Sequence, residues 1–597
     1  MSPTHSNSGA EFPPTTYEEW EAAASGALRG RPVESLATTT IDGIVRAPLY
    51  TAETSPGADD RAGLPGAVPH TRGGRAGGTV TGWEVRQTHD AADPAVNGLI
   101  LRDLERGVTA ITLDNAPATV DELDEVLAGV YLDLAPVHLG AGSTAQQRAA
   151  LRSLLDRRGV PGSSSVGCLG ADPFGYPDDE QDVRSLAAEA VALGDNLHGV
   201  RAMVLDGRPL HEAGAGDVQE LGALLSAGVA WLRALTDAGL DVTGAAARLE
   251  FTVTVGPDQF ASIAKLRAAR TCWSRIVEAA GGDPDAAPMF LHAETASAMF
   301  TQRDPWVNML RCTTACFSAA VGGADAITVL PFDAVLGAAE EFGLRIARNT
   351  QLILSEESHL NAVIDPAGGS WYVEDLTEAI ARSSWAFFQD IERQGGRAAV
   401  KDSGWLEAAI AGTKQARTEQ IATRAQPITG ISEFPDIDER PPLDRVPAVA
   451  EDDQRWAAPF ERLRDAADRA ERRPEVYLAN LGSVATHTAR ATFAKNLFEA
   501  GGIRATGSAG STEPAEVAAG FAESGCRIAC ICSSDAVYDD IGPATAAALV
   551  AAGASRVYLA GPPGAQADEL RAAGVAEFVH LGCDVLAVLR GAHDLLS

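Results

Sequence analysis

The sequence predicts an α/β protein in two parts, a (β/α)8 TIM barrel followed by a doubly wound, flavodoxin-like domain. Short apolar runs alternate with helical stretches from Trp83 onward, and this alternation repeats eight times in about 270 residues. A second, shorter alternation begins at Val476 and predicts the smaller domain. The length of 597 residues is sufficient for two separate cores.

Composition and charge restrict the function. Apolar residues make up 46% of the chain and charged residues 22%, as in soluble globular proteins. The net charge of -33 argues against nucleic acid and anionic membranes as partners. The sequence has neither a membrane-length apolar run nor an apolar signal core, so we expect a cytoplasmic protein. Cys526, Cys530 and Cys532 are close together, and we expect them on a buried strand rather than around a metal ion.

Residues 1–40 are predicted to form an N-terminal arm. Residues 1–16 are rich in Ser, Thr and Pro, and residues 17–28 form a short amphipathic helix with Trp20 as its apolar anchor. This helix either packs on its own barrel or contacts a partner subunit. A loop rich in Gly, Pro and Ala follows at 53–80.

The barrel is predicted at 41–395. Two helix starts have the spacing of capping boxes, one at Thr119 and Glu122 and the other at Ser143 and Gln146. Its strands are expected at 83–88, 109–113, 136–140, 163–168, 201–205, 249–255, 289–292 and 325–330.

The rest of the chain divides into a linker and the second domain. Residues 396–473 contain more charge and Pro and are predicted to be a helical linker along the surface. Residues 474–597 are predicted to be the doubly wound domain. Its strands are expected at 476–479, 527–532, 557–559 and 577–580, and its helices at 486–500, 542–552 and 564–573.

Residues 347–377 give the strongest indication of a family. Their sequence, ARNTQLILSEESHLNAVIDPAGGSWYVEDLT, resembles the barrel-closing region of methylmalonyl-CoA mutases, which depend on adenosylcobalamin. The resemblance extends from about Tyr17 to the C-terminus with uneven quality. It implies the same barrel with a CoA chain along its axis, a C-terminal domain of the cobalamin-binding type, and an N-terminal arm that lies along a dimer interface.

The loop at 206–215 departs from the family where the chemistry takes place. Glu212 agrees with the family, but the family's carbonyl-polarising histidine falls on Pro209 and its neighbouring tyrosine on Arg208. Proline has no side-chain donor or acceptor, so it cannot polarise a carbonyl group. His211 is the other candidate, and we expect it to be a histidine on a surface loop.

Two further segments of the family's substrate pocket are replaced. Residues 69–78 stand where the family has an aromatic segment with a tyrosine over the substrate. Arg72 and Arg75 are expected to lie in a solvated loop rather than to meet a CoA phosphate. The family's Thr-Ser-Gly-Trp is Thr-Ala-Ser-Ala at 295–298, which removes a large wall.

The family's cobalamin motif, Asp-x-His-x-x-Gly, is also altered. In the family the histidine coordinates cobalt, the aspartate orients its imidazole, and the glycine lets the corrin tail pass. Here the motif is ATHTAR, so His487 keeps the ligand position while Ala485 and Arg490 replace the other two residues. Asp535 stands where an apolar contact is expected, and a Gly-Gly pair is Ala-Gly at 560–561. We therefore expect His487 to be a vestigial cofactor-binding residue.

These departures predict the non-catalytic small subunit of a heterodimeric mutase that interconverts succinyl-CoA and (R)-methylmalonyl-CoA. The expected partner is a homologous catalytic large subunit that binds adenosylcobalamin and the acyl-CoA. We expect this chain to contribute no catalytic residue, no metal site and no cofactor, and to fill part of its barrel axis with its own side chains. One alternative is an active mutase that uses His487 and His211. The other is a stand-alone acyl-CoA-binding or regulatory protein.

Overall fold

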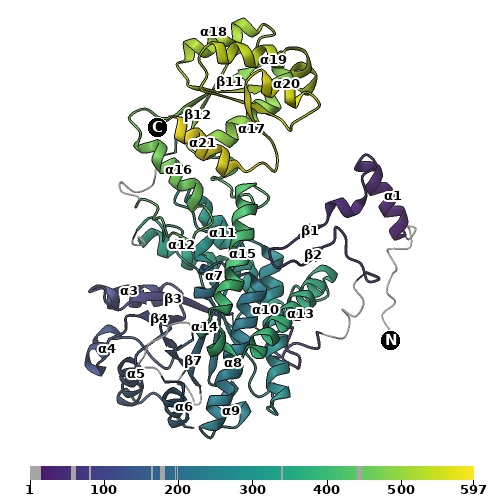
Figure 1. Ribbon diagram of the computed structural model, residues 1–597. Helices are drawn as coiled ribbons and strands as arrows, with labels where there is room; N and C mark the ends of the chain where they lie inside the picture. The colour runs from purple at the N-terminus through teal and green to yellow at the C-terminus, as the bar shows by residue number, and fades with distance from the viewer. Residues whose placement is uncertain are drawn as a thin grey trace.

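A barrel, a smaller α/β domain beyond one of its ends, and a projecting N-terminal arm make up the molecule (Figure 1). The computed structural model describes residues 15–54, 62–78, 82–162, 166–174, 182–194, 197, 199–337, 341–439 and 447–596. Within these ranges, no helix is both long enough and apolar enough to cross a membrane.

Eight parallel strands close into the barrel in the order β10-β3-β4-β5-β6-β7-β8-β9. The (β/α)8 prediction is confirmed. The fourth predicted strand begins later than expected, at Gly167, and residues 163–165 lie outside the described ranges. The strands are β3 (Glu84–Asp90), β4 (Ala110–Asp114), β5 (Val137–Leu139), β6 (Gly167–Ala171), β7 (Val200–Asp206), β8 (Leu249–Val255), β9 (Phe290–Thr295) and β10 (Ala326–Thr328).

Helices cover the outside of the barrel, and α13 packs against α8 and α10. Phe251 and Trp273 meet edge to face in the core beneath them, with ring centroids 4.8 Å apart. The helices are α3 (Val96–Glu105), α4 (Val120–Val126), α5 (Ala145–Arg157), α6 (Val183–Ala192), α7 (Arg208–Glu212), α8 (Asp217–Asp237), α9 (Val242–Ala246), α10 (Gln259–Ala279), α11 (Trp306–Val321), α12 (Glu341–Leu352) and α13 (Trp371–Arg393).

One of the two predicted helix starts is displaced by one residue. Thr119 caps α4 as expected. The capping box of α5, however, is formed by Thr144 and Gln147, so the prediction for Ser143 and Gln146 was wrong. The hydroxyl of Ser143 donates instead to the carbonyl oxygen of Leu169 at 2.5 Å, which leaves the extended N-cap position to Thr144.

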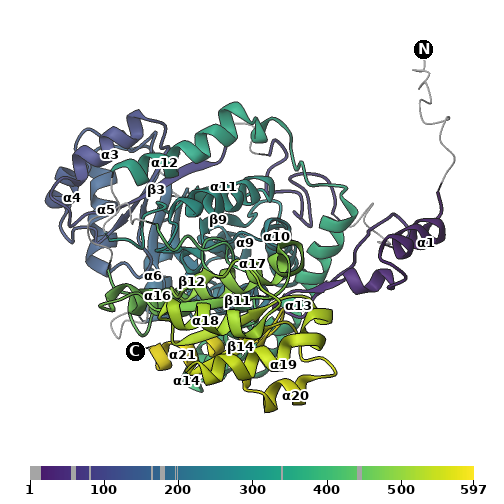
Figure 2. The same ribbon diagram turned by 90° about the horizontal axis from the view of Figure 1, so that it is seen from above.

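The arm extends away from the barrel (Figures 1 and 2). Its helix α1 (Tyr17–Ala27) has a complete capping box, but none of its residues is buried. The helix therefore does not pack on its own barrel. A short 3-10 helix (Val33–Leu36) and the hairpin of β1 (Thr38–Thr39) and β2 (Val45–Arg46) connect it to the body.

The second sheet has five parallel strands in the order β12-β11-β13-β14-β15, which is the flavodoxin-like arrangement. The predicted doubly wound domain is confirmed, although β12, α18 and α21 were not anticipated. The strands are β11 (Glu475–Asn480), β12 (Arg504–Gly507), β13 (Ile528–Cys532), β14 (Arg556–Ala560) and β15 (Val575–Val579). The helices are α17 (Val484–Ala500), α18 (Pro514–Ser524), α19 (Asp535–Ala551), α20 (Ala567–Ala572) and α21 (Val585–Leu596).

Cys530 and Cys532 are buried on β13, as expected, and burial raises the pKa of the Cys530 thiol well above its usual range. The prediction for Cys526 was wrong: α18 ends at Ser524 and β13 begins only at Ile528, so Cys526 lies in the loop between them and is partly exposed. Among the described residues, no group of three or more His, Cys, Asp or Glu side chains is arranged to hold a metal ion.

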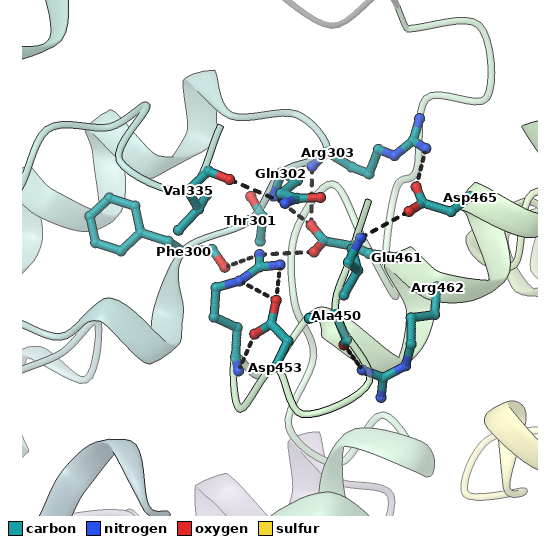
Figure 3. Close-up of polar contacts among 12 residues, drawn as sticks. Phe300, Thr301, Gln302, Arg303, Val335, Ala450, Asp453, Glu461, Arg462 and Asp465 are labelled. Atoms are coloured by element: carbon teal, nitrogen blue, oxygen red, sulfur yellow. Dashed lines mark hydrogen bonds and ion pairs between the residues drawn. The ribbon is translucent and has the colours of Figure 1, made fainter. Parts of the chain in front are cut away.

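The linker joins the two parts through α14 (Arg397–Asp402), α15 (Trp405–Ala422) and α16 (Ala458–Arg469). Glu461 on α16 is fully buried, and its Oε1 accepts the backbone N–H groups of Gln302 at 2.5 Å and Arg303 at 3.1 Å (Figure 3). Its Oε2 pairs with Arg455 at 2.8 Å, and Arg303 pairs with Asp465 at 2.7 Å. The linker thereby holds the loop that follows β9.

Candidate functional site

Charged side chains occupy the barrel axis, where the resemblance implies a CoA chain. Glu250 on β8 pairs with Arg86 on β3 at 2.6 Å, and both side chains are only 2% exposed. His138 on β5 lies 3.3 Å from the second carboxylate oxygen of Glu250. Burial alone would raise the pKa of Glu250, but the charges of Arg86 and His138 lower it well below the ordinary range.

Arg208 closes the end of the axis at the carboxyl ends of the strands. Its guanidinium pairs with Asp206 at the end of β7 at 2.7 Å and with Glu294 on β9 at 3.0 Å. The cavity that remains between these side chains and the Glu250 network is about 20 Å³. That space is sufficient for a water molecule and not for a CoA chain. The prediction that the axis is partly filled by its own side chains is confirmed.

His211 is not a surface-loop histidine, and that prediction was wrong. It is 7% exposed, and its Nδ1 lies 3.5 Å from Oε2 of the fully buried Glu220. The physical reason is that residues 208–212 form the short helix α7, which turns the imidazole inward against Trp456 of the linker. Pro209 at the start of this helix was the sequence signal that could have indicated it.

The other replaced pocket residues have structural contacts. Arg72 pairs with Asp365 at 2.7 Å and Arg75 with Asp325 at 3.0 Å, so the solvated loop expected for them is instead attached to the barrel by ion pairs. The hydroxyl of Ser297 donates to Glu212 at 2.8 Å. Each of these side chains therefore has a partner within the protein.

Two of the replaced residues in the C-terminal domain, Arg490 and Asp535, meet at the carboxyl edge of its sheet. Arg490 on α17 pairs with Asp535 at 2.6 Å, and its guanidinium lies 5.1 Å from the ring centroid of Tyr538. A Cβ atom added to Gly561 would be 2.7 Å from Nη1 of Arg490. The guanidinium therefore occupies the space between the ends of β13 and β14. This edge is where ligands of doubly wound domains bind.

His487 lies beside this group in the first turns of α17. It is 6% exposed, and its Nδ1 has no hydrogen-bond partner among the described residues. A Cβ atom added to Gly510 would be 2.8 Å from Cε1 of the imidazole, so the loop after β12 covers the ring closely. The imidazole is thus enclosed by its own domain.

Comparison with known proteins identifies the family. A family model described as methylmalonyl-CoA mutase matches residues 115–513. The chain belongs to the methylmalonyl-CoA mutase family. It is 47% identical to the methylmalonyl-CoA mutase small subunit of Streptomyces virginiae, over 98% of both chains. The corresponding small subunits of Propionibacterium freudenreichii subsp. shermanii (36%; 100% of this chain and 97% of the relative) and Porphyromonas gingivalis (31%; 98% of both) are also similar.

The mutases of this family depend on adenosylcobalamin, and the residues at the sheet edge do not fit that cofactor. Cobalamin needs an imidazole that faces solvent and a clear groove for its nucleotide tail. Here His487 is covered by the loop at Gly510, and Arg490 occupies the groove together with Asp535. Ala485 also replaces the aspartate that orients the imidazole in the family. Loss of such a carboxylate reduces metal affinity by roughly 10–100-fold.

A cluster of titratable groups connects the arm to the barrel. Asp42 of the hairpin accepts the N–H groups of Asp217 at 3.2 Å and Val218 at 3.3 Å, at the start of α8. Behind it, Lys265 pairs with Glu220 at 2.7 Å and Asp217 at 2.9 Å. Burial and then the charge of Asp217 raise the pKa of Asp42 from 3.8 to about 6.

Asp42→Asn is expected to change the pH dependence of stability. Because the folded-state pKa is raised, neutral Asp42 stabilises the fold fully below about pH 3.8, and this contribution is lost as the pH rises through 6. Asparagine stays neutral and keeps one of the two acceptor oxygens, which leaves a pH-independent cost but removes the titration. The variant should therefore gain about 2 kcal/mol relative to wild type between pH 4 and pH 7. Urea unfolding of both proteins across this range measures the difference, and a constant difference contradicts the prediction.

Proposed function

We propose that this chain is the non-catalytic small subunit of a heterodimeric methylmalonyl-CoA mutase, which interconverts succinyl-CoA and (R)-methylmalonyl-CoA. The observation that supports this most directly is the Arg208 ion-pair network, which occupies the barrel end where the family's substrate reacts. Arg490 and Asp535 support it independently in the second domain. The catalytic positions of the family have thus become structural ones.

The partner in this proposal is a homologous large subunit that binds both adenosylcobalamin and the acyl-CoA. This chain has no catalytic residue and no cofactor of its own, and His487 is a vestige of the cobalt-ligand position. The eight free cysteines fit the reducing cytoplasm, where we place the enzyme.

The proposal assigns four parts to the chain. Residues 1–40 are the arm that contacts the partner, and α1 supports this because it is formed without any buried residue. Residues 41–395 are the barrel, residues 396–473 are the linker, and residues 474–597 are a degenerate domain of the cobalamin-binding type. A pairing of two homologous barrels would make the interface pseudo-symmetric.

Titration of the purified chain with adenosylcobalamin, followed by its visible spectrum, tests the proposal. We expect no spectral shift with the chain alone, and binding with mutase activity when it is co-expressed with a homologue that has an intact Asp-x-His-x-x-Gly motif. A shift in the single chain that His487→Ala abolishes would establish an active mutase instead. A stable homodimer that does not bind the large subunit would favour the stand-alone acyl-CoA-binding protein.

A further inference from the structure

A second cavity, of about 840 Å³, lies at the carboxyl end of the barrel and is distinct from the filled axis. Its walls come from the hairpin at 39–46, the loops after β7, β8 and β9, and the linker around α15. Barrel enzymes bind ligands at this face, and small-molecule sites have volumes of about 300–1,000 Å³. The cavity therefore has both the position and the size of a ligand site.

One wall of this cavity is apolar. Met299, Leu310 and Trp456 line it, and Leu310 is 67% exposed. Trp456 is held in place because its backbone N–H donates to the carbonyl oxygen of Ala298 at 3.0 Å. An indole fixed in this way offers a flat surface on which an apolar or planar ligand group can pack.

The acidic groups of the cavity already have partners. Asp217 pairs with Lys265 at 2.9 Å, and Asp258 pairs with Arg46 at 2.6 Å. Asp42 accepts the N–H groups at the start of α8. Each carboxylate in the wall is therefore already paired with, or hydrogen-bonded to, a protein group, and the cavity does not call for a cationic ligand.

Two arginines of the cavity lack such partners. Arg417 donates to the carbonyl oxygens of Gly214 and Ala215 at 3.0 and 3.4 Å. Arg311 donates through Nη2 to the carbonyl oxygen of Thr429 at 2.8 Å, and through Nη1 to the neutral side chains of Asn308 at 2.8 Å and Thr301 at 3.0 Å. In the described part of the chain, no carboxylate oxygen lies within 4.0 Å of either guanidinium. The charges of Asp217 and Asp42 act on Arg417 only from farther away. Burial lowers the pKa of both groups, so each is a desolvated cation that an anion would stabilise.

His211 adds a third polar group to the same wall. Its imidazole is 7% exposed, its Nδ1 lies 3.5 Å from Oε2 of Glu220, and its Nε2 has no hydrogen-bond partner among the described residues. Its ring centroid lies 6.2 Å from that of Trp456, and the guanidinium of Arg417 lies 5.5 Å from the indole. His211 and Arg417 therefore both lie next to the indole ring of Trp456.

We propose that this cavity binds an amphipathic organic acid, whose acid group is held by Arg417, Arg311 and His211 and whose apolar body packs on Trp456, Leu310 and Met299. Both features are required: no carboxylate of the described residues contacts either guanidinium group directly, and the wall beside them is apolar. This inference concerns a site outside the barrel axis and holds whether or not the chain is a small subunit.

Isothermal titration calorimetry of the full-length chain with octanoate tests the proposal. We expect saturable binding at one site, binding of octanol at least about tenfold weaker, and no binding of inorganic phosphate at the same concentrations. Octanol that binds as tightly as octanoate would overturn the role of the arginines. Phosphate that binds as tightly would overturn the role of the apolar wall, and absence of octanoate binding would overturn the site.

Substitutions of residues in the cavity wall test whether octanoate binds in this cavity. Arg417→Gln and Arg311→Gln should each weaken octanoate binding by about tenfold, because each removes one charge-assisted contact. Arg46→Gln is the matched control: Arg46 lines the same cavity but is already paired with Asp258, so binding should be unchanged. If a glutamine variant unfolds, the corresponding lysine variant, Arg417→Lys or Arg311→Lys, is measured in its place, because lysine keeps the positive charge. Equal effects of the Arg46 and Arg417 variants would contradict the assignment.

Discussion

Deletion of residues 1–31 is expected to abolish stable association with the large subunit without lowering the melting temperature of the isolated chain. No residue of α1 is buried, and Tyr17 and Trp20 form an aromatic pair with centroids 5.3 Å apart on a helix that faces solvent. Exposed aromatic anchors of this kind are typical interface hot spots, each contributing about 2–4 kcal/mol to binding. Loss of both should weaken the complex by at least about 100-fold.

Two measurements separate the effects of this deletion. Calorimetric melting of the single chain should change by less than about 1 °C, since the deleted helix contributes no core contact. Gel filtration and a dissociation constant measured with the large subunit should show the loss of association. Tyr17→Ala with Trp20→Ala should reproduce the loss, while Glu18→Ala on the same helix should not. An undiminished complex would show that α1 has a different role.

The sequence predicted the strands that contain an apolar run and missed β12, an edge strand without one. The strand β8 was predicted and observed at 249–255, because a central parallel strand is a continuous apolar run. The strand β12 has the sequence RATG, lies at the edge of its sheet, and pairs only with β11. Because β12 has no apolar pattern, only its hydrogen bonding to β11 in the structure identifies it as a strand.

The replaced site residues were found from the sequence, but their contacts were not. Position in the family's motifs is a property of the sequence, and it identified Arg208 and Arg490 as departures. Their partners are 86 and 45 residues away, at Glu294 and Asp535. Parallel strands bring such distant residues together at their carboxyl ends, so these pairs depend on the tertiary fold. The burial of His211 escaped prediction for the same reason.

Glu250→Ala is expected to destabilise the protein by about 3–5 kcal/mol, because it removes the fully buried partner of a buried charge. The guanidinium of Arg86 is 2% exposed and would keep only Glu84, which is 24% exposed and lies at 2.8 Å. His138 would also lose the carboxylate 3.3 Å from its Nδ1. Urea unfolding at neutral pH, where Glu250 is ionised, measures the loss.

Glu278→Ala is the matched control for this variant. Its ion pair with Arg275 is exposed at both ends, with side chains 53% and 64% accessible, so its loss should change stability by less than about 0.5 kcal/mol. Similar losses in the two variants would contradict a structural role for the axial charges. The expected contrast would mean that the side chains that fill the barrel axis also stabilise the barrel. Truncating them would then unfold the protein rather than open the axis.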